Sequence, residues 1–471
     1  MTPRVIAQST DAVPSRLPPH MNSADVVICG AGIAGIAAAY HLAVRQGIPR
    51  VVLVDEREPL TLTSDKGTQG YRNWWPGPDD TMLRLVSRSI DLLEESAAEC
   101  GNAFRMNRRG YLFATGDTSQ AGIMERTARE VSSLGMGPLR VHRDTSGYEA
   151  ALPEGFVNQP IGADLLLGGE ARRAFPFLTE QTVAALHIRR AGWFSGVALG
   201  TRLLQQAVAA GVTFVRDRVD GVDTTGGKVR SVRLASGAII GTEKFVVAAG
   251  PALPTVTRML GIDLPVFHEL HAKLTMRDPR GAVPRDAPFV IWTDPMQLAW
   301  SAEHRAALSR TDQGRRLLES MPGGVHVRPV DLTYGDELYL IWTFETDVRP
   351  YEWPPSFNPM YAEAVLRGCA RMIPALDAYG DASSGFVDGG FYCKTPENRP
   401  LIGPLPVEGA FVIGALSGSG LMAAHACGEL LSLHVAGASL PDSARWFLPS
   451  RYDDASYREL VAGWGPLAGQ L

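Results

Sequence analysis

The most regular hydrophobic pattern in the chain lies between residues 26 and 54. Residues 26–29 are all apolar, which is typical of a short strand buried on both faces, and residues 51–54 repeat this pattern. The apolar run over 36–44 is long enough to favour a helix packed on a sheet. A membrane span over 26–44 is disfavoured, because three glycines interrupt the run and its period changes in the middle. The pattern therefore predicts a strand–helix–strand unit.

Shorter elements follow in the rest of the chain. Residues 212–250 contain β-rich pieces separated by glycine turns, which predicts a meander that ends in a buried strand before Gly250. Near the C-terminus, an apolar strand at 410–414 leads through a glycine-rich loop at 414–420 into a helix at 421–435. Further strands are expected at 288–292, 325–329 and 337–345.

Composition narrows the class of protein. Of the 471 residues, 45% are hydrophobic and 20% charged, and the net charge is −5. These values are ordinary for a soluble globular protein and favour neither nucleic acid nor an anionic membrane as a partner. The five cysteines are scattered without a C-x-x-C pair, which fits a reducing compartment and no structural zinc. Residues 1–21 lack the apolar core of a secretion signal, so we expect a flexible tail and a cytoplasmic protein.

Three glycines after the first strand carry the main chemical signal. They form G-x-G-x-x-G between the strand and the helix. The first glycine of this pattern allows a tight turn, the second lets the backbone approach a pyrophosphate, and the third lets the helix pack close to the strand. The N–H groups at the helix start face the phosphates, and an acid that ends the second strand is placed to accept a ribose hydroxyl. The spacing indicates a bound dinucleotide but does not separate FAD from NAD. The expected contacts are Gly30, Gly32, Ile33, Ala34, Gly35, Asp55, Glu56 and Arg57.

The C-terminal segment of the chain distinguishes FAD from NAD as the expected dinucleotide. It contains Thr395-Pro396-Glu397, Pro400-Leu401-Ile402-Gly403, the strand at 410–414, and Ser417-Gly418-Ser419-Gly420 ahead of the last long helix. In this order the pieces closely resemble the C-terminal flavin segment of the D-amino-acid oxidase superfamily, which includes glycine oxidase, sarcosine oxidase and dimethylglycine dehydrogenase. The meander at 212–250 resembles the second dinucleotide-contact segment of the same fold.

The resemblance implies an α/β (α+β) fold with two parts. A glutathione-reductase-like Rossmann domain would bind FAD, and an antiparallel-sheet substrate domain would roof the flavin. FAD is expected to be non-covalent, because Gly390 stands where the sarcosine-oxidase branch has the cysteine that tethers its cofactor. The expected FAD-binding domain comprises 22–115, 180–260 and 385–471, and the expected substrate domain comprises 116–179 and 261–384.

The resemblance also implies a reacting site. Arg72 falls near the place where the sarcosine-oxidase branch holds its substrate carboxylate, for which a guanidinium provides a bidentate clamp. A structural ion pair is the alternative role for this arginine. Tyr392 matches an active-site tyrosine that would bond the substrate, and Tyr339 lies on the strand expected to face the flavin. Further expected cofactor contacts are Ser64, Lys66, Gly67, Thr68, Val219, Ala249, Gly250, Gly414, Gly418, Ser419, Gly420, Leu421 and Met422.

Some positions depart from the sarcosine-oxidase branch. Met422 replaces a lysine that helps to bind the carboxylate, and Tyr339 replaces a lysine that promotes reaction with oxygen. Lys273 is a candidate substitute base, although we expect it to be solvated. His268 and His271 are three apart on an expected strand, which points them to opposite faces, so no metal site is expected.

The expected reaction is oxidation of a C–N bond in an amine or amino-acid-like small molecule, with hydride transfer to flavin N5 and an imine as product. Reoxidation would use molecular oxygen, giving hydrogen peroxide, or an electron-transfer partner. Three alternatives stay open at this point. They are a 2-hydroxy acid dehydrogenase of the same fold, an NAD(P)H-dependent flavin monooxygenase, and a flavin-binding protein without catalytic activity.

Overall fold

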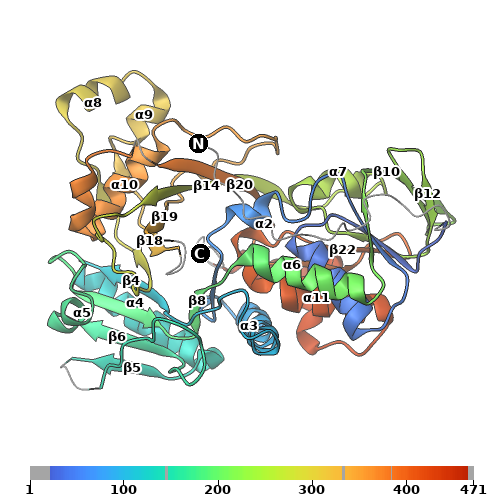
Figure 1. Cartoon of the computed structure of the whole chain (residues 1–471), viewed down its shortest axis with the longest axis horizontal. Helices are drawn as coiled ribbons and strands as arrows, with labels where there is room; N and C mark the ends of the chain where they lie inside the picture. The colour runs from blue at the N-terminus through green and yellow to red at the C-terminus, as the bar shows by residue number, and fades with distance from the viewer. Residues whose placement is uncertain (1–21, 144–146, 331–334, 383–384, 465–471) are drawn as a thin grey trace.

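Two sheets organise the molecule, one in each lobe (Figure 1). The computed structural model describes residues 22–143, 147–330, 335–382 and 385–464, so the tail expected over 1–21 lies outside the described residues. One lobe is built on a six-stranded sheet and the other on a nine-stranded sheet. Two long strands of the nine-stranded sheet, β14 (Phe267–Arg277) and β20 (Phe386–Lys394), run towards the lobe that contains the six-stranded sheet (Figure 1).

The six-stranded sheet has the order β21-β22-β13-β1-β2-β9. Its neighbours pair in parallel except for β21 and β22, which are antiparallel. All residues of β1 are buried, as expected for a strand covered on both faces. The strands are β1 (Val26–Cys29), β2 (Val51–Asp55), β9 (Thr213–Arg216), β13 (Phe245–Val247), β21 (Leu401–Pro404) and β22 (Ala410–Gly414).

Two helices meet in backbone contact beside this sheet. Helix α1 (Ile33–Tyr40) is buried along its whole length, and α11 (Gly420–Ala436) crosses it. A Cβ added to Gly428 of α11 would lie 2.7 Å from the carbonyl carbon of Ala37, so only glycine permits this approach. Helices α3 (Thr81–Glu99) and α6 (Gly196–Ala209) pack against the same pair.

The predicted meander is present next to β9. It forms a three-stranded antiparallel sheet of β10 (Val219–Thr225), β11 (Lys228–Leu234) and β12 (Ile239–Gly241). Gly226 and Gly227 make the first turn with φ of 61° and 75°, a conformation that glycine adopts at low cost. The meander returns to the main sheet through β13.

The nine-stranded sheet has the order β20-β14-β19-β18-β15-β4-β7-β6-β5. It is antiparallel apart from the β15–β4 and β5–β6 pairs, which are parallel, so the roof is mixed and not purely antiparallel as expected. Helix α10 (Tyr361–Met372) packs on one face of it. The other strands are β4 (Tyr111–Thr115), β5 (Leu139–His142), β6 (Ala163–Leu167), β7 (Ala184–Ile188), β15 (Phe289–Trp292), β18 (Val325–Pro329) and β19 (Glu337–Ile341).

Sheet membership differs from the expected division of the chain at three strands. β4, β7 and β20 fall in segments that were expected to join the FAD-binding lobe, yet their backbones pair within the nine-stranded sheet. The physical reason is that pairing follows the register of the whole sheet, which local patterns do not reveal. Strand β19 also ends at Ile341, earlier than expected, and an irregular loop follows it.

Apart from the 14-residue helix α4, the remaining α-helices and strands in the described ranges have at most eight residues. None of the helices in the described ranges combines the length and the apolar character that a bilayer crossing requires. These elements are α2 (Thr63–Lys66), β3 (Gly70–Arg72), α4 (Thr118–Val131), α5 (Gly169–Ala174), β8 (Ala191–Trp193), α7 (Leu253–Arg258), β16 (Met296–Gln297), α8 (Ala302–Leu308), α9 (Asp312–Arg316), β17 (Ser320–Met321) and α12 (Ala455–Ala462).

Candidate active site

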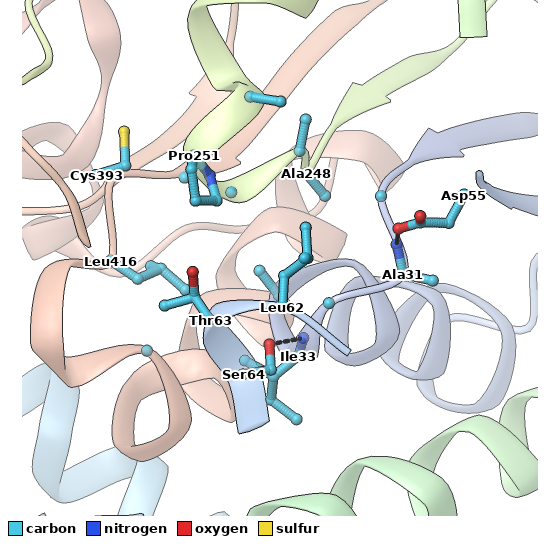
Figure 2. Close-up of a pocket in the computed structure, with 18 of the residues that line it drawn as sticks. Ala31, Ile33, Asp55, Leu62, Thr63, Ser64, Ala248, Pro251, Cys393 and Leu416 are labelled. Carbon is cyan, nitrogen blue, oxygen red and sulfur yellow. Dashed lines mark hydrogen bonds between the residues drawn. The ribbon is translucent and has the colours of Figure 1, made fainter. Parts of the chain in front are cut away.

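A cavity of about 370 Å³ opens at the carboxyl ends of the parallel strands, where β1 leads into α1 and the loop after β22 leads into α11 (Figure 2). Ligands of open α/β sheets bind at this edge. The wall comes from six stretches of chain that are far apart in the sequence and from one further residue, Tyr351. The six stretches lie within 29–34, 54–70, 217–219, 248–259, 391–393 and 413–421.

The glycine turn after β1 fits the role predicted from its spacing. Gly30 has φ +112°, and a Cβ there would lie 2.4 Å from the carbonyl oxygen of Ala248. A Cβ on Gly35 would lie 1.8 Å from the carbonyl oxygen of Gly30. Side chains at either position would push the helix away from the strand, so the two glycines create the close packing that leaves the α1 N-terminus open to the cavity.

Two side chains tie the surrounding loops to this turn (Figure 2). The Ser64 hydroxyl accepts a hydrogen bond from the Ile33 N–H at 3.0 Å, at the first turn of α1. The Asp55 carboxylate accepts from the N–H groups of Ala31 at 2.7 Å and Arg57 at 2.9 Å. Burial raises the pKa of Asp55 even though these two N–H groups oppose the shift. The end of β2 is therefore fixed beside the turn, with Glu56 and Arg57 at the cavity wall.

The loop between β22 and α11 forms the opposite wall. Ala415 and Ser417, both at the cavity, have φ of 51° and 52°, while Leu416 between them is right-handed. Non-glycine residues adopt left-handed conformations at a cost and concentrate at ligand sites. Alternating handedness turns successive N–H groups towards one side, where they favour an electron-rich group. The first residues of α11 add their N–H groups to this wall.

Most of the predicted cofactor contacts line the cavity, and four do not. Gly35 lies behind the turn, the Ser419 hydroxyl donates to the Leu416 carbonyl, and Lys66 pairs with Asp65 and Asp388 instead. Met422 is the fourth. The predicted cofactor contacts that do line the cavity are Gly30, Gly32, Ile33, Ala34, Asp55, Glu56, Arg57, Ser64, Gly67, Thr68, Val219, Ala249, Gly250, Gly414, Gly418, Gly420 and Leu421.

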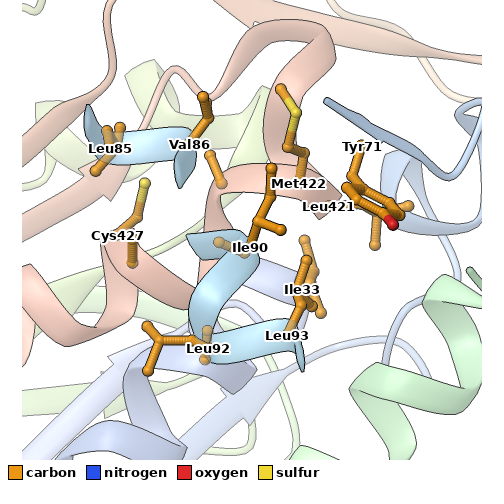
Figure 3. Packing of buried hydrophobic residues seen from close by; sticks show 14 of the residues in the cluster. Ile33, Tyr71, Leu85, Val86, Ile90, Leu92, Leu93, Leu421, Met422 and Cys427 are labelled. Atoms are coloured by element: carbon orange, nitrogen blue, oxygen red, sulfur yellow. The ribbon is translucent and has the colours of Figure 1, made fainter. Parts of the chain in front are cut away.

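Met422 points into the core between α11 and α3 (Figure 3). Its neighbours there include Ile90 and Leu421 (Figure 3). The Met422 sulfur accepts a hydrogen bond from the Arg72 N–H at 3.1 Å. This residue therefore supports the backbone of β3 and does not touch the cavity. The resemblance had placed Met422 at the flavin, because it stands where the sarcosine-oxidase branch has a lysine in its C-terminal glycine loop.

Over β20, β14, β19 and β18, the face of the nine-stranded sheet turned away from α10 is polar, whereas towards β7 and β6 the same face is apolar, with Leu165, Leu186 and Ile188 in the core. Residues directly opposite each other on paired strands share a face, and alternate residues along a strand do so too. The register pairs Lys273 with Asp388, Glu269 with Tyr392, and Arg328 with Tyr339. Intervening positions such as Leu274, Val327 and Leu340 form the apolar core under α10. On the polar face, which we call the underside, lie Tyr111, Glu269, His271, Lys273, Arg328, Tyr339, Asp388 and Tyr392.

Arg72 ends β3 close to this underside. Its guanidinium lies over the Tyr111 ring, with Cζ 5.2 Å from the ring centroid. Within the described residues, Arg72 Nε is buried and makes no hydrogen bond. Burial raises the pKa of the Tyr111 hydroxyl, although Arg72 and Arg328 oppose the shift. Arg72 thus presents hydrogen-bonding capacity that a carboxylate would satisfy.

Tyr392 connects the underside to the cavity, whose wall it joins. Its ring stacks on His271 with centroids 4.0 Å apart. Burial raises the pKa of Tyr392 to about 12, with Tyr111 adding to the shift, so the hydroxyl stays protonated at neutral pH. The imidazole of His271 bonds Glu269 at 3.0 Å, and Glu269 also bonds Lys394. His268 and His271 do occupy a strand, where an odd separation puts them on opposite faces.

Tyr339 does not reach the cavity. The Lys273 ammonium lies 4.4 Å from its ring centroid and 3.3 Å from an Asp388 oxygen. The expectation of a solvated Lys273 was wrong, because the strand carries this side chain into the space between the lobes, where it is 4% exposed. Burial lowers the pKa of Lys273, and Asp388 opposes that shift.

Sequence reasoning missed several residues of this region. Arg328 is buried between the rings of Trp193 and Tyr339, and its Nε donates to the Thr68 carbonyl at 3.0 Å, which links the sheet to the cavity loop. Only the alternation of β18 could have flagged it. Tyr351 lines the cavity from an irregular loop, and no sequence signal indicated it.

Comparison with known proteins places this geometry in a family. The profile of the family described as FAD dependent oxidoreductase (DAO) matches residues 25–433. The chain belongs to this family. FAD is therefore its cofactor, and the α/β fold expected from the C-terminal segment is confirmed.

The relatives support the same assignment at low identity. Mitochondrial sarcosine dehydrogenase of Mus musculus is 24% identical over 90% of this chain but only 41% of its own length, so the chain spans less than half of that relative. D-amino acid dehydrogenase of Rhodopseudomonas palustris is 23% identical over 80% of the chain and 86% of its own length. The fold is similar to that of L-proline dehydrogenase from P. horikoshii, with a TM-score of 0.70, 20% identity, and coverage of 92% of this chain and 98% of the other.

The cavity fits FAD on the features of this chain alone. The close backbone packing at Gly30 and Gly35 brings the start of α1 to the cavity wall, where the pyrophosphate would bind. Asp55 stands at the end of β2 beside the ribose position. The loop 414–420 would face the flavin ring with its N–H groups, beneath Tyr392.

Proposed function

We propose that this protein oxidises a C–N bond of a small amine or amino acid that carries a carboxylate. Tyr392 carries the proposal, because it belongs both to the cofactor cavity and to the polar underside that holds Lys273 and Arg328. The family is one of FAD-dependent oxidoreductases. Proteins of similar fold include an L-proline dehydrogenase and an iminodiacetate oxidase, whose names both denote substrates with a C–N bond beside a carboxylate.

In this reaction the carbon atom gives up a hydride and not a proton, so the protein has to bind and orient the substrate and needs no base to remove a proton from carbon. FAD supplies the hydride acceptor when bound. The substrate loses a hydride from the carbon next to nitrogen and a proton from nitrogen, which leaves an imine. Water hydrolyses this imine to a carbonyl compound and either ammonia or an amine. Within this scheme, Arg72 would hold the carboxylate in a bidentate bond. The protonated Tyr392 hydroxyl would donate to the same carboxylate, and its raised pKa keeps that proton in place.

Two finer points belong to the same proposal. We propose that FAD is held without a covalent bond, because burial raises the pKa of Cys393 to about 12 and keeps this cavity thiol from acting as a nucleophile. Acid precipitation tests this directly, since dissociable FAD leaves the protein pellet colourless. The electron acceptor would be molecular oxygen or an electron-transfer protein.

An anaerobic titration of the yellow protein tests the substrate class. A panel of N-methyl and cyclic amino acids, simple amines and 2-hydroxy acids is added while the oxidised flavin band at about 450 nm is followed. Bleaching by a carboxylate-bearing amine supports the proposal, and recovery in air then identifies oxygen as the acceptor. Bleaching by 2-hydroxy acids alone, or by NADPH alone, would overturn it.

A further inference from the structure

A closed loop of the larger lobe extends to the cofactor cavity. Residues 345–358, here named the clasp loop, lie between β19 and α10 and contain no helix or strand. Its ends are joined, since Asn358 Nδ2 donates to Glu345 Oε1 at 2.7 Å. Compact loops with adjoining ends form stable surface units and are often functional.

Further contacts shape the clasp loop before any ligand binds. Asp347 pairs with Arg316 of α9 at 2.8 Å, and the Arg349 N–H donates to the His268 carbonyl of β14 at 3.1 Å. Three prolines, Pro350, Pro354 and Pro355, restrict the backbone of the tip. The tip is therefore held against the first residues of β14, at the edge of the larger sheet.

Tyr351 is the residue of the tip that reaches the cavity wall. Its ring packs edge-on against Phe391, with centroids 5.6 Å apart, and lies tilted against His268, with centroids 6.3 Å apart. Burial raises the pKa of the Tyr351 hydroxyl, and Tyr351 lines the same cavity as Asp55, Glu56 and Arg57 at the end of β2. This is the end of the cavity where the ribose of a dinucleotide bonds.

Trp353 makes a second contact with the same end of β2. The Arg57 guanidinium lies over its ring, with Cζ 5.6 Å from the ring centroid. Arg57 in turn donates its backbone N–H to Asp55. The tip of the clasp loop and the strand end that carries the ribose acceptor therefore meet over one end of the cavity, although they are about 300 positions apart in the sequence.

We propose that the clasp loop closes over the ribose end of FAD, with Tyr351 contacting the cofactor and Trp353 holding Arg57 across the opening. Release of FAD then requires the cation–π contact and the Tyr351 packing to separate first. The loop slows dissociation of the cofactor more than it slows binding, since contacts made after docking act on the off-rate. This role concerns the cofactor alone and does not depend on which substrate is oxidised.

The test measures FAD affinity of the full chain without substrate. FAD is removed from the wild type and from Tyr351→Ala, Trp353→Ala and Val348→Ala, and rebinding is followed by quenching of FAD fluorescence. Val348 is a matched control, because it lies in the same loop but is 66% exposed. We expect Tyr351→Ala to raise the Kd at least about tenfold, which equals 1.4 kcal/mol, chiefly through a faster off-rate. Trp353→Ala should have a smaller effect in the same direction, and Val348→Ala should match the wild type.

A second measurement separates loss of the clasp from loss of folding. The FAD-free forms of the wild type and Tyr351→Ala are melted side by side, and equal melting temperatures with a weakened Kd support a direct contact. Hydrogen exchange in the peptide spanning the clasp loop should slow when FAD is added to the wild type. Kd values of Tyr351→Ala and Trp353→Ala within twofold of the wild type, or exchange in the loop that FAD does not change, would overturn the proposal.

Discussion

The imidazole of His271 lies almost parallel to the ring of Tyr392, with centroids 4.0 Å apart and an angle of 17° between the planes. His271 is fixed in turn by Glu269, which bonds its Nε2 at 3.0 Å and also bonds Lys394. Glu269 and Tyr392 are direct partners in the β14–β20 register. Residues of two adjacent strands thus set the position of the tyrosine that faces the cofactor cavity. Burial lowers the pKa of His271 despite Glu269, so the ring is neutral at pH 7 and acts by contact and not by charge.

Replacing Tyr392 with phenylalanine should reduce substrate oxidation without weakening FAD binding. The change keeps the ring and its stack on His271 but removes the hydroxyl. A hydrogen bond to a charged group contributes about 1.5–3 kcal/mol, so we expect kcat/KM to fall about 10- to 150-fold. Stopped-flow reduction of the flavin and a parallel FAD titration measure the two effects. An unchanged reduction rate would remove Tyr392 from the substrate site.

Arg72 provides a test of substrate charge. Arg72→Gln removes the charge, and Arg72→Lys keeps it but loses the two-pronged geometry. We expect Arg72→Gln to raise KM for a carboxylate-bearing amine about 10- to 100-fold, in line with the loss of a charge-assisted bond, and Arg72→Lys to recover part of this loss. Reaction with an amine that lacks a carboxylate should change little. Equal losses with both substrates would show that Arg72 only supports the structure.

Local rules predicted the cofactor lobe well. The strand at 410–414 and the turn at Gly30 follow from short-range demands, namely burial on both faces and the absence of a Cβ. The substrate side could not be predicted in the same way. The Lys273–Asp388 pair joins strands 115 positions apart, and only their register makes them neighbours. Tyr351 lies on an irregular loop, where periodicity carries no information.

Gly35→Ala should separate α1 from β1 and so impair FAD binding. The added Cβ would lie 1.8 Å from the Gly30 carbonyl oxygen, and the shift needed to relieve this contact disturbs the turn at the pyrophosphate. Overpacking of this kind costs about 1–3 kcal/mol. We expect a lower melting temperature and a weaker FAD Kd. Gly122→Ala is the matched control, because Gly122 lies in α4 with only the end of the Arg126 side chain nearby, at 3.6 Å. A Gly35→Ala protein that binds FAD normally would contradict the assigned role of this glycine.

A buried pair of histidines should make stability fall in acid. His41, which directly follows α1, and His425 of α11 face each other, with Nε2 and Nδ1 2.9 Å apart. Burial lowers the pKa of both imidazoles from 6.5 to about 3. The unfolded chain therefore binds these protons below pH 6.5 while the folded chain does not, so stability is full above pH 6.5 and declines as the pH falls towards 3. Each imidazole contributes up to about 1.4 kcal/mol per pH unit in this window.

Urea unfolding at pH 7 and at pH 5 measures how the free energy of unfolding changes with pH for the wild type and for the double variant His41→Gln/His425→Gln. We expect the variant to be less stable at pH 7 but to show a shallower decline, and a decline as steep as that of the wild type would mean that other groups control acid unfolding.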